Sequence, residues 1–402
     1  MKPPLLILNA GSSSLKFAVF QETAAGFQSV LAGTFSRLGQ PESELRIKST
    51  QAAAATARSV STGDHASCLD VILGELKRVT GLTKITAVGH RVVHGGPKFS
   101  DPLRITPDLI RALRGLSSFD PEHLPAEIGL MEHVARRFPQ TPQIACFDTA
   151  FHHALPRLAQ LLPLPRRYAE AGVRRYGFHG LSYEFLLREL ARLGDAAATR
   201  GRVILAHLGS GASLAAVHDG RCIDTSMGFT PTAGLMMGTR TGDLDPGLVA
   251  YLAQTEKMSA AQFSRLVNHE SGLRGISETT ADMGALLTLE TTDIRAAEAI
   301  ALFCYQAKKW LGAYTAALGG LDTLVFSGGI GENCPTVRAR ICEGLGFLGV
   351  ELDPAENATN AAVISVPASR VAVRVIATDE ELMIAEHMRS VLSADAVAAN
   401  SL

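Results

Sequence analysis

The sequence predicts an α/β fold made of two duplicated domains with mixed sheets. Strand-like runs alternate with amphipathic stretches of helical length along the chain, a pattern typical of α/β layers. At ~100–200 residues per domain, the 402 residues correspond to about two domains. Residues 5–20 (LLILNAGSSSLKFAVF) and 203–218 (VILAHLGSGASLAAVH) share the order strand, glycine turn, strand, half the chain apart. This similarity favours duplication over the alternative, two unrelated hairpins with common Gly-Ser turns.

The two hairpins can be compared position by position. In an alignment without a gap, Asn9 aligns with His207, and identical pairs follow, among them Gly11 with Gly209, Ser12 with Ser210, and Val19 with Val217. Each hairpin continues into a segment bounded by glycine, at 31–35 and at 219–224. A meander of three strands is therefore expected at the start of each half.

The other elements follow from hydrophobic periodicity. Amphipathic helices are expected at 66–79, 125–138, 246–254, 259–268, 295–317 and 379–392. Strands are expected at 85–93, 143–147 and 322–327. We expect an N-terminal domain of residues 1–150 and a C-terminal domain of residues 151–382, with the C-terminal helix (383–402) packing back on the first.

Composition excludes several classes of protein. Lys plus Arg number 38 and Asp plus Glu 39, so the chain lacks the basic excess of a general nucleic-acid binder. Its apolar runs stop well short of the ~20 residues that span a bilayer. Polar residues from Asn9 onward interrupt any signal-peptide core, so we expect a cytoplasmic protein without membrane or nucleic-acid partners. Six cysteines without a CxxC pair and twelve histidines without HExxH argue against a zinc site or a disulfide framework.

Three glycine-rich turns follow apolar strands. They are NAGSSS (9–14), HLGSGAS (207–213) and SGGIGEN (327–333). Closely spaced backbone N–H groups without side-chain obstruction are a common phosphate cradle, although a tight hairpin is the alternative for any single turn. Together the turns indicate a nucleotide held between the two halves. Lys16 follows the first turn, where its ammonium could meet a phosphate, although a lone lysine there is more often solvated.

Four further segments interleave charges with aromatic and apolar residues, which solvated loops rarely do. They are GHRVVHGG (89–96), FDTAFH (147–152), RRYGFHG (174–180) and MMGTRTGDLDPG (236–247). Arg91, Asp148, His179 and Arg240 are the candidates for a site that gathers negative charge. For each residue alone, a structural ion pair is the alternative.

With these motifs in view, the chain resembles the acetate kinase family. These are the acetate/propionate kinases, the acetokinase branch of the actin-like sugar kinase and heat-shock ATPase superfamily. The resemblance covers nearly the whole chain and rests on eight motifs in family order: LNAGSSSLKF, GHRVVHGG, FDTAFH, YGFHG, HLGSGAS, MGFTPTAGLMMGTRTGDLDPG, FSGGIGEN and TDEELMIAEH. It implies two duplicated actin-like (ribonuclease H-like) domains around a central cleft, in a homodimer. It also implies reversible transfer from ATP to acetate with Mg²⁺, for which Mn²⁺ could substitute, giving acetyl phosphate and ADP.

Such a reaction needs cations rather than a base. A carboxylic acid with a pKa of about 4–5 is already ionised at neutral pH. The protein must overcome repulsion between two anions and stabilise charge on the transferring phosphoryl group. By the resemblance, Arg91 holds the carboxylate, while Arg240 and His179 stabilise the phosphoryl group. Asp148 resembles the family's essential aspartate and more plausibly orients the substrate, the Mg²⁺ shell or an arginine than abstracts a proton.

The resemblance implies roles for further residues. The acyl site would be formed, beside Arg91, by Val93, His123, Phe178 and Pro231. Nucleotide-binding positions would be Lys16, His207, Leu208, Gly209, Ser210, Gly211, Asp282, Met283, Gly284, Gly329, Ile330, Gly331, Glu332 and Asn333. Asn9 and Glu380 resemble the magnesium ligands, with the oxygen donors that this ion prefers.

The chain departs from the family pattern at several positions. They are Glu122 for Leu before His123, Ser210 for Asn, Gly284 for Arg, and Leu181-Ser182-Tyr183 for Thr-Ser-His. Glu122 either turns to solvent or pairs with an arginine, or it faces the acyl pocket and sets specificity. Propionate or another short-chain acid, or pyrophosphate as donor, is the alternative within the class. A catalytically weak nucleotide-binding regulator and a sugar kinase are the alternatives outside it.

Overall fold

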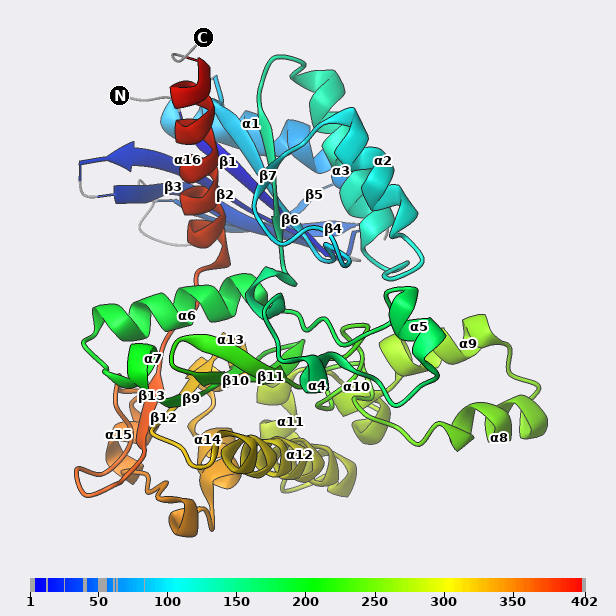
Figure 1. The fold of residues 1–402 in the computed structure, drawn as a ribbon, viewed down its shortest axis with the longest axis vertical. Coiled ribbons are helices and arrows are strands. Elements are labelled where there is room, and N and C mark those ends of the chain that lie inside the picture. Colours follow the sequence, from blue (N-terminus) through cyan, green and yellow to red (C-terminus); the bar gives the residue numbers. More distant parts are fainter. Residues whose placement is uncertain are drawn as a thin grey trace. The chain divides into compact units, whose positions relative to one another are not determined.

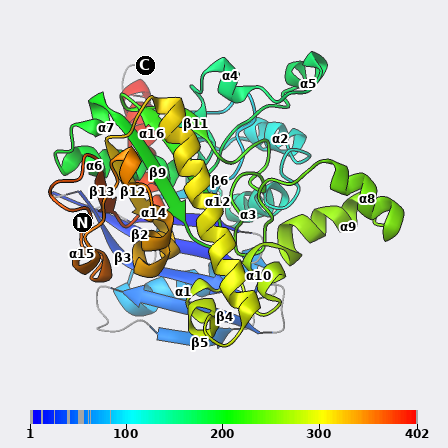
Figure 2. The same ribbon diagram turned by 90° about the horizontal axis from the view of Figure 1, so that it is seen from below.

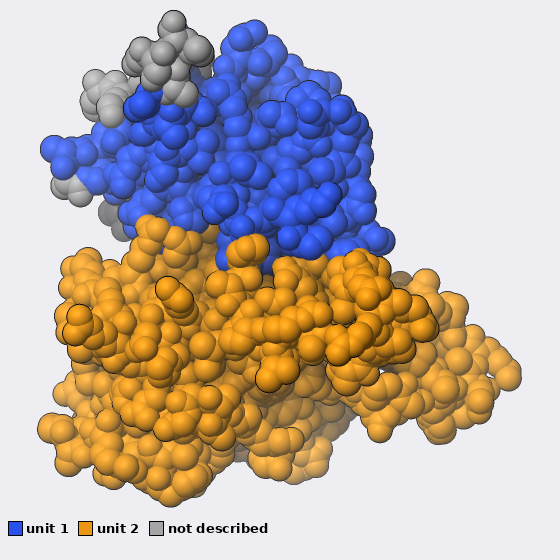
Figure 3. All heavy atoms as spheres, viewed as in Figure 1, with its two compact units in different colours: residues 1–150, 379–402 blue, residues 151–378 orange. Residues whose placement is uncertain are grey.

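The computed structural model describes residues 4–11, 14–24, 26–38, 42–49, 56–60, 62, 64–82 and 84–399. Ser12 and Ser13 of the first glycine turn therefore lie outside the described residues. The chain divides into two compact units (Figure 3). Unit 1 comprises Met1–Ala150 and Asp379–Leu402, and unit 2 comprises Phe151–Thr378. Each unit holds one mixed sheet with helices packed on it, which confirms the predicted α/β class.

The sheet of unit 1 is built around its first strand. In spatial order its strands are β5 (Thr56–Val60), β4 (Ser43–Ser49), β3 (Gly26–Ser36), β2 (Leu15–Thr23), β1 (Leu5–Ala10), β6 (Ala87–Val92), β8 (Gln143–Phe147) and β7 (Leu103–Arg104). Strand β1 pairs antiparallel with β2 and parallel with β6, and β8 continues the parallel part. The predicted meander is present as β1, β2 and β3.

Helices cover both faces of this sheet. They are α1 (His65–Thr80), α2 (Pro107–Gly115), α3 (Leu124–Arg137) and α16 (Glu380–Ala399). Val88 of β6 lies in one hydrophobic core with Ile72 of α1 and Leu130 of α3. A Cβ on Gly89, the next residue of β6, would instead meet side chains of α16. Because successive strand residues point to opposite faces, α16 covers the face away from α1 and α3.

The sheet of unit 2 repeats this topology. Its strands, in spatial order, are β11 (Arg221–Thr225), β10 (Ala212–His218), β9 (Arg202–Leu208), β12 (Thr323–Ser327) and β13 (Ala372–Val375). Strand β9 pairs antiparallel with β10 and parallel with β12, as β1 pairs with β2 and β6. The two sheets therefore share an antiparallel meander followed by parallel strands, as the predicted duplication requires.

Unit 2 carries most of the helices. Within the described chain they are α4 (Arg157–Gln160), α5 (Arg166–Glu170), α6 (Gly180–Arg192), α7 (Ala197–Arg200), α8 (Gly247–Thr255), α9 (Ala260–Arg265), α10 (Gly272–Ser277), α11 (Met283–Leu289), α12 (Ile294–Leu318), α13 (Gly328–Asn333), α14 (Pro335–Cys342) and α15 (Pro354–Ala358). Helices α6 and α12 lie on opposite sides of the sheet (Figure 1), and α12 packs on β10 and β9, running past β9 in Figure 2. Among the described residues, no helix is long and apolar enough to cross a bilayer.

Two sequence predictions need correction. The hairpins do not align without a gap, because Asn9 lies opposite Lys16 whereas His207 lies opposite Ser213. The first turn is one residue longer, so Val19 corresponds to Ala216 once the first strands are matched.

The second correction concerns the segment 328–333, which is a short helix, α13, rather than an open glycine turn. Within it, only the first residue, Gly328, has a positive φ (76°). The Glu332 carboxylate accepts the Gly328 N–H at 2.8 Å, so a side chain of the segment satisfies the first donor of the helix.

Candidate functional site

Arg91 and Asp148 form an ion pair in unit 1, in which the arginine side chain is 14% exposed and the aspartate is fully buried. Arg91 lies near the end of β6 and Asp148 directly follows the parallel neighbour β8, so both reach the same edge of the sheet. Nη2 of Arg91 lies 2.7 Å from Oδ2 of Asp148. Burial alone would lower the pKa of Arg91, but the negative charges of Asp148 and Glu380 outweigh it and raise this pKa, and Glu127 adds to the effect once it is ionised. The arginine therefore stays charged, and the aspartate holds it in place.

Glu127 is a second buried carboxyl group near Arg91. It lies in the first turn of α3, is 2% exposed, and accepts the backbone N–H of Val93 at 3.0 Å. Burial raises the pKa of Glu127 to about 8, although the charge of Arg91 and the Val93 N–H partly offset it. At neutral pH the carboxyl is mostly protonated and adds little negative charge around Arg91.

We expect Glu127→Gln to raise the melting temperature by roughly 3 °C or more at pH 8.5 and to leave it nearly unchanged at pH 5. The folded protein keeps this proton up to about pH 8, whereas an unfolded glutamate releases it near pH 4–5. The folded state thus binds more protons in this window, and stability falls as pH rises through it. Glutamine cannot ionise and escapes this loss. Calorimetry at pH 5, 7 and 8.5 measures the difference.

Glu132→Gln is the matched control for this prediction. Glu132 lies on the same helix, but its carboxyl is partly exposed to water and pairs with Arg114. Its replacement should leave the pH dependence of the melting temperature as in the wild type. Parallel pH profiles for wild type and Glu127→Gln would contradict the prediction.

His123 is held by an aspartate that the sequence analysis did not single out. Its Nδ1 lies 2.9 Å from Oδ1 of Asp120, and both side chains are buried. Burial would raise the pKa of Asp120, but the hydrogen bonds and charge of His123 outweigh it and lower this pKa. Glu122 is half-buried, and its backbone N–H also donates to Asp120. The partner of His123 is therefore Asp120, and a specificity role for Glu122 stays a prediction.

Asn9 meets two carboxylates at the start of α16. Its Nδ2 donates to Glu380 at 3.1 Å and to Glu381 at 3.3 Å. Burial, together with the charge of Glu380, raises the pKa of Glu381, while Lys16 opposes this shift. Lys16 lies opposite Asn9 in the sheet and is exposed. Two neighbouring carboxylates beside an amide form an oxygen donor set that suits a hard divalent cation.

In unit 2 the second glycine turn lies beside α13. A Cβ on Gly209 would lie 3.8 Å from the backbone N of Gly329 and 3.9 Å from Nε2 of His207. Ser210 is exposed, and its carbonyl accepts the N–H of Gly238 at 3.0 Å. The structure thus brings the segments of the second and third predicted glycine turns together, with the loop that carries Arg240 attached to them.

His179 and Arg240 meet at Gly211. A Cβ on Gly211 would lie 3.1 Å from Nε2 of His179 and 3.8 Å from Nη1 of Arg240. Nη1 of Arg240 also donates to the Pro231 carbonyl at 3.3 Å. This arrangement places an imidazole nitrogen and a guanidinium beside a backbone segment without a side chain. It can receive a tetrahedral anion.

The residue before His179 is fixed by a buried histidine. Nε2 of His152 donates to the Phe178 carbonyl at 2.9 Å. Gly177 has φ 75°, and a Cβ there would lie 2.6 Å from the His152 ring, so glycine is needed for this approach. His179 itself has φ 59°, a left-handed conformation that non-glycine residues adopt at a cost. The chain therefore holds His179 in one orientation.

The other predicted nucleotide positions are divided between helix ends and the core. Asp282 caps α11 by accepting the Ala285 N–H at 2.7 Å, and Gly284 is exposed beside it. Asn333 donates from Nδ2 to the Gly329 carbonyl within α13. The buried positions are Leu208, Met283, Ile330 and Gly331.

Arg338 supports α13 from within the core. It is fully buried, and its Nη1 donates to the Gly331 carbonyl at 2.8 Å and to the Glu332 carbonyl at 3.0 Å. A buried guanidinium thus satisfies the last carbonyls of the helix that follows the third predicted glycine turn.

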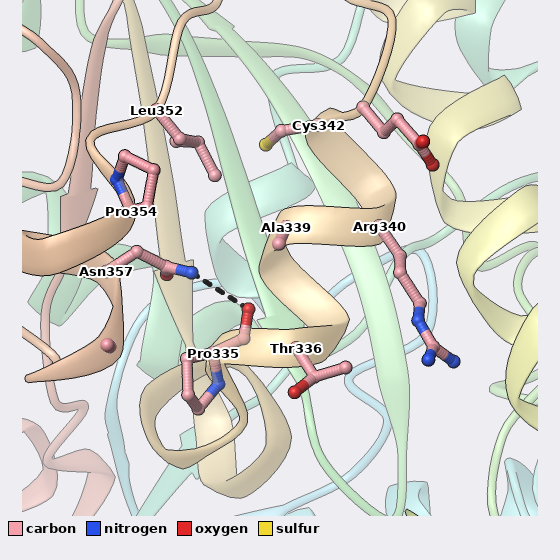
Figure 4. A pocket seen from close by; sticks show the side chains of 10 residues that line it. Pro335, Thr336, Ala339, Arg340, Cys342, Leu352, Pro354 and Asn357 are labelled. Carbon is pink, nitrogen blue, oxygen red and sulfur yellow. Dashed lines mark hydrogen bonds between the residues drawn. The ribbon is translucent and has the colours of Figure 1, made fainter. Parts of the chain in front are cut away.

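An open cavity of about 770 Å³ lies between α14 and α15. Figure 4 shows Ala339, Cys342 and Leu352 at its lining, with the Asn357 amide donating to the Pro335 carbonyl. None of the predicted site residues lines it. This cavity is therefore not part of the predicted site.

Sequence reasoning missed several residues that contact the predicted ones. They are Asp120, Glu127, Ser213, Arg338 and Glu381. Asp120 precedes His123 by three positions, and Glu381 directly follows Glu380. Both spacings could have predicted that these residues lie close to the predicted site residues. Glu127 lies on an amphipathic helix, where a charged residue usually reaches solvent, and the buried Arg338 also lies on a helix.

Comparison with known proteins gives one consistent result. A model of the acetokinase family matches residues 4–386. An acetate kinase of Rhodopseudomonas palustris is 45% identical over 393 residues, which cover 96% of this chain and 98% of that protein. The crystal structure of Porphyromonas gingivalis acetate kinase has a TM-score of 0.87 at 36% identity and covers 97% of this chain and 100% of that one. A propionate kinase from Francisella tularensis has a TM-score of 0.89 at 35% identity, with coverages of 96% and 98%.

Proposed function

The chain belongs to the acetokinase family, and we propose that it transfers the γ-phosphoryl group of ATP to acetate, giving acetyl phosphate and ADP. The observation that carries the proposal is the meeting of His179 and Arg240 at Gly211. Two donors beside bare backbone suit a transferring phosphoryl group, whose charge is spread over its equatorial oxygens. A protein that only bound nucleotide would not need both.

The acid is proposed to bind at Arg91. Its guanidinium stays charged and is anchored by Asp148 at 2.7 Å. Val93, which is buried, and His123, which is held by Asp120, would line the acyl site. The family resemblance also assigns Phe178 and Pro231 a role in binding the acid. Arginine suits a carboxylate because its planar fork donates two parallel hydrogen bonds.

A divalent cation, proposed to be Mg²⁺, would be held by Asn9 and Glu380. Glu381 joins them in the proposal, because Asn9 donates to both carboxylates. The ion would supply positive charge that neutralises phosphate oxygens. The residues of this chain would hold it through oxygen donors, as such ions require.

The proposed reaction needs no general base. A carboxylate oxygen forms a bond to the γ-phosphorus while the bond from that phosphorus to the bridging oxygen breaks. The electron pair of the broken bond stays on ADP. Because acetate is already ionised at neutral pH, no proton has to be removed. Asp148 is engaged with Arg91 and is proposed to orient it rather than to accept a proton.

The proposal is tested by trapping acyl phosphate with hydroxylamine. We expect the purified protein to form acetyl hydroxamate from acetate and Mg-ATP. Acids from formate to butyrate and the donors ATP, GTP and pyrophosphate complete the panel. Nucleotide binding without acyl phosphate formation from any acid would overturn the proposal in favour of a regulator.

Propionate is the second candidate substrate, because a propionate kinase is among the similar solved structures. A higher kcat/KM for propionate than for acetate in the same panel would select it. A homodimer, which the resemblance implies, is also proposed. Light scattering that gives the mass of one 42.6 kDa chain would contradict it.

A further inference from the structure

A chain of buried hydroxyl groups lies behind His179. Nδ1 of His179 is 2.8 Å from Oγ of Ser213, and the same Oγ is 2.5 Å from the hydroxyl of Tyr183. Ser213 and Tyr183 are both 0% exposed. Tyr183 occupies one of the positions at which the chain departs from its family's usual motif, where histidine is expected.

We propose that Tyr183 is a positioning residue which, through Ser213, holds His179 neutral with its proton on Nε2. Nε2 is the nitrogen that lies beside Gly211 and Arg240. A proton there lets His179 donate to a phosphoryl oxygen. The inference rests on the proposed role of His179 in phosphoryl transfer.

The order of the protons follows from the chemistry of the three groups. A phenol is a stronger acid than an aliphatic alcohol, so Tyr183 donates to Ser213. Ser213 then uses its own proton to donate to Nδ1 of His179, and the ring proton resides on Nε2. A positively charged His179 would have to donate from Nδ1 to Ser213. Oγ of Ser213 would then accept from both His179 and Tyr183, and the Ser213 proton would lose Nδ1 as its acceptor.

The His179 ring has polar neighbours besides this chain of hydroxyl groups. Charged and titratable groups near the His179 ring include His207, whose ring stacks at 4.2 Å, Arg240 beside Gly211, and Tyr183 itself. His207 has a separate chain, in which Nδ1 lies 2.8 Å from Ser182, and Ser182 accepts from Thr378. Removing the Tyr183 hydroxyl leaves His207 and Arg240 in place.

Tyr183→Phe tests the proposal, because it removes one oxygen and keeps the ring. That ring packs against Phe151 at 5.8 Å and His152 at 5.7 Å, contacts that phenylalanine retains. We expect kcat for acetyl phosphate formation to fall about 10-fold with less than about a two-fold change in KM. We also expect the ¹⁵N-detected titration midpoint of His179 to rise by about half a pH unit or more. A His179→Gln sample assigns its signals.

Tyr314→Phe is the matched control. Tyr314 is also a buried tyrosine of unit 2, and its hydroxyl has no hydrogen-bond partner among the described residues. This variant should match the wild type in kcat and in the His179 titration. In a Ser213→Ala background, Tyr183→Phe should have no further effect, because the chain is already broken.

The outcomes separate this inference from the proposed function. If the wild type makes no acyl phosphate but Tyr183→Phe still shifts the His179 titration, the positioning role stands and the function fails. If the wild type is active and Tyr183→Phe equals Tyr314→Phe in kcat and titration, the positioning role is overturned. A lower kcat with an unshifted titration and a lower melting temperature also overturns it, in favour of a packing role.

Discussion

Replacing Arg240 with lysine is expected to lower kcat by about 10²-fold or more while changing the KM for nucleotide little. Lysine keeps the charge but lacks the planar guanidinium. Of the two fixed donors proposed for the phosphoryl group, His179 and Arg240, only His179 would then remain. In the structure Nη1 of Arg240 is oriented by the Pro231 carbonyl and lies near Gly211 beside His179. An ammonium on a flexible stem cannot reproduce that placement. Steady-state kinetics of acyl phosphate formation measure the loss.

Arg274→Lys is the control, because Arg274 is exposed on the neighbouring helix α10 and should tolerate the change. Gly211→Ala supplies an independent check, since its methyl group would lie 3.1 Å from Nε2 of His179. We expect it to lower kcat as well. Near-wild-type kinetics for both Arg240→Lys and Gly211→Ala, at normal stability, would remove this cluster from the site.

The elements of the fold follow largely from local patterns, and the exceptions have physical causes. The long periodic stretch at 295–317 forms α12, and the apolar run at 143–147 forms β8. The segment 328–333 reads as a turn because glycine disfavours helix. It is helical because Glu332, within the segment, accepts its first N–H, and because Arg338, further along the chain, donates to the Gly331 and Glu332 carbonyls.

The residues of the candidate site were visible as motifs, but their partners were not. A glycine-rich or charged motif is recognisable by its composition, whereas Glu127 lies on a helix whose packing alone decides its surroundings. Its contact with Val93 joins helix α3 to the residue that follows β6, and one sequence carries no signal for that pairing. The hydrogen bond between Tyr183 and Ser213 likewise joins two separate elements, helix α6 and strand β10. Such contacts form only when separate elements pack together.

Asp148→Asn is expected to lower kcat/KM for the acid by about 10²-fold or more. The aspartate holds the Arg91 guanidinium at 2.7 Å, and asparagine leaves that buried cation without its counter-charge. Loss of one partner of a buried pair also destabilises, by roughly 3–5 kcal/mol. Arg91→Lys should mainly raise the KM for the acid. Because both changes break one pair, their effects should be less than additive in the double variant.

Asp195→Asn is the matched control, since Asp195 pairs with Arg374 at 2.9 Å in unit 2 and belongs to none of the predicted site segments. It should cost stability without a comparable loss of kcat/KM. The pH dependence decides the role of Asp148 itself. If Asp148 orients Arg91 rather than accepting a proton, wild type and Asp148→Asn should show the same acidic limb, set by ionisation of the acid and the metal ligands. A limb present in the wild type and absent in Asp148→Asn, after correction for substrate ionisation, would make Asp148 a general base.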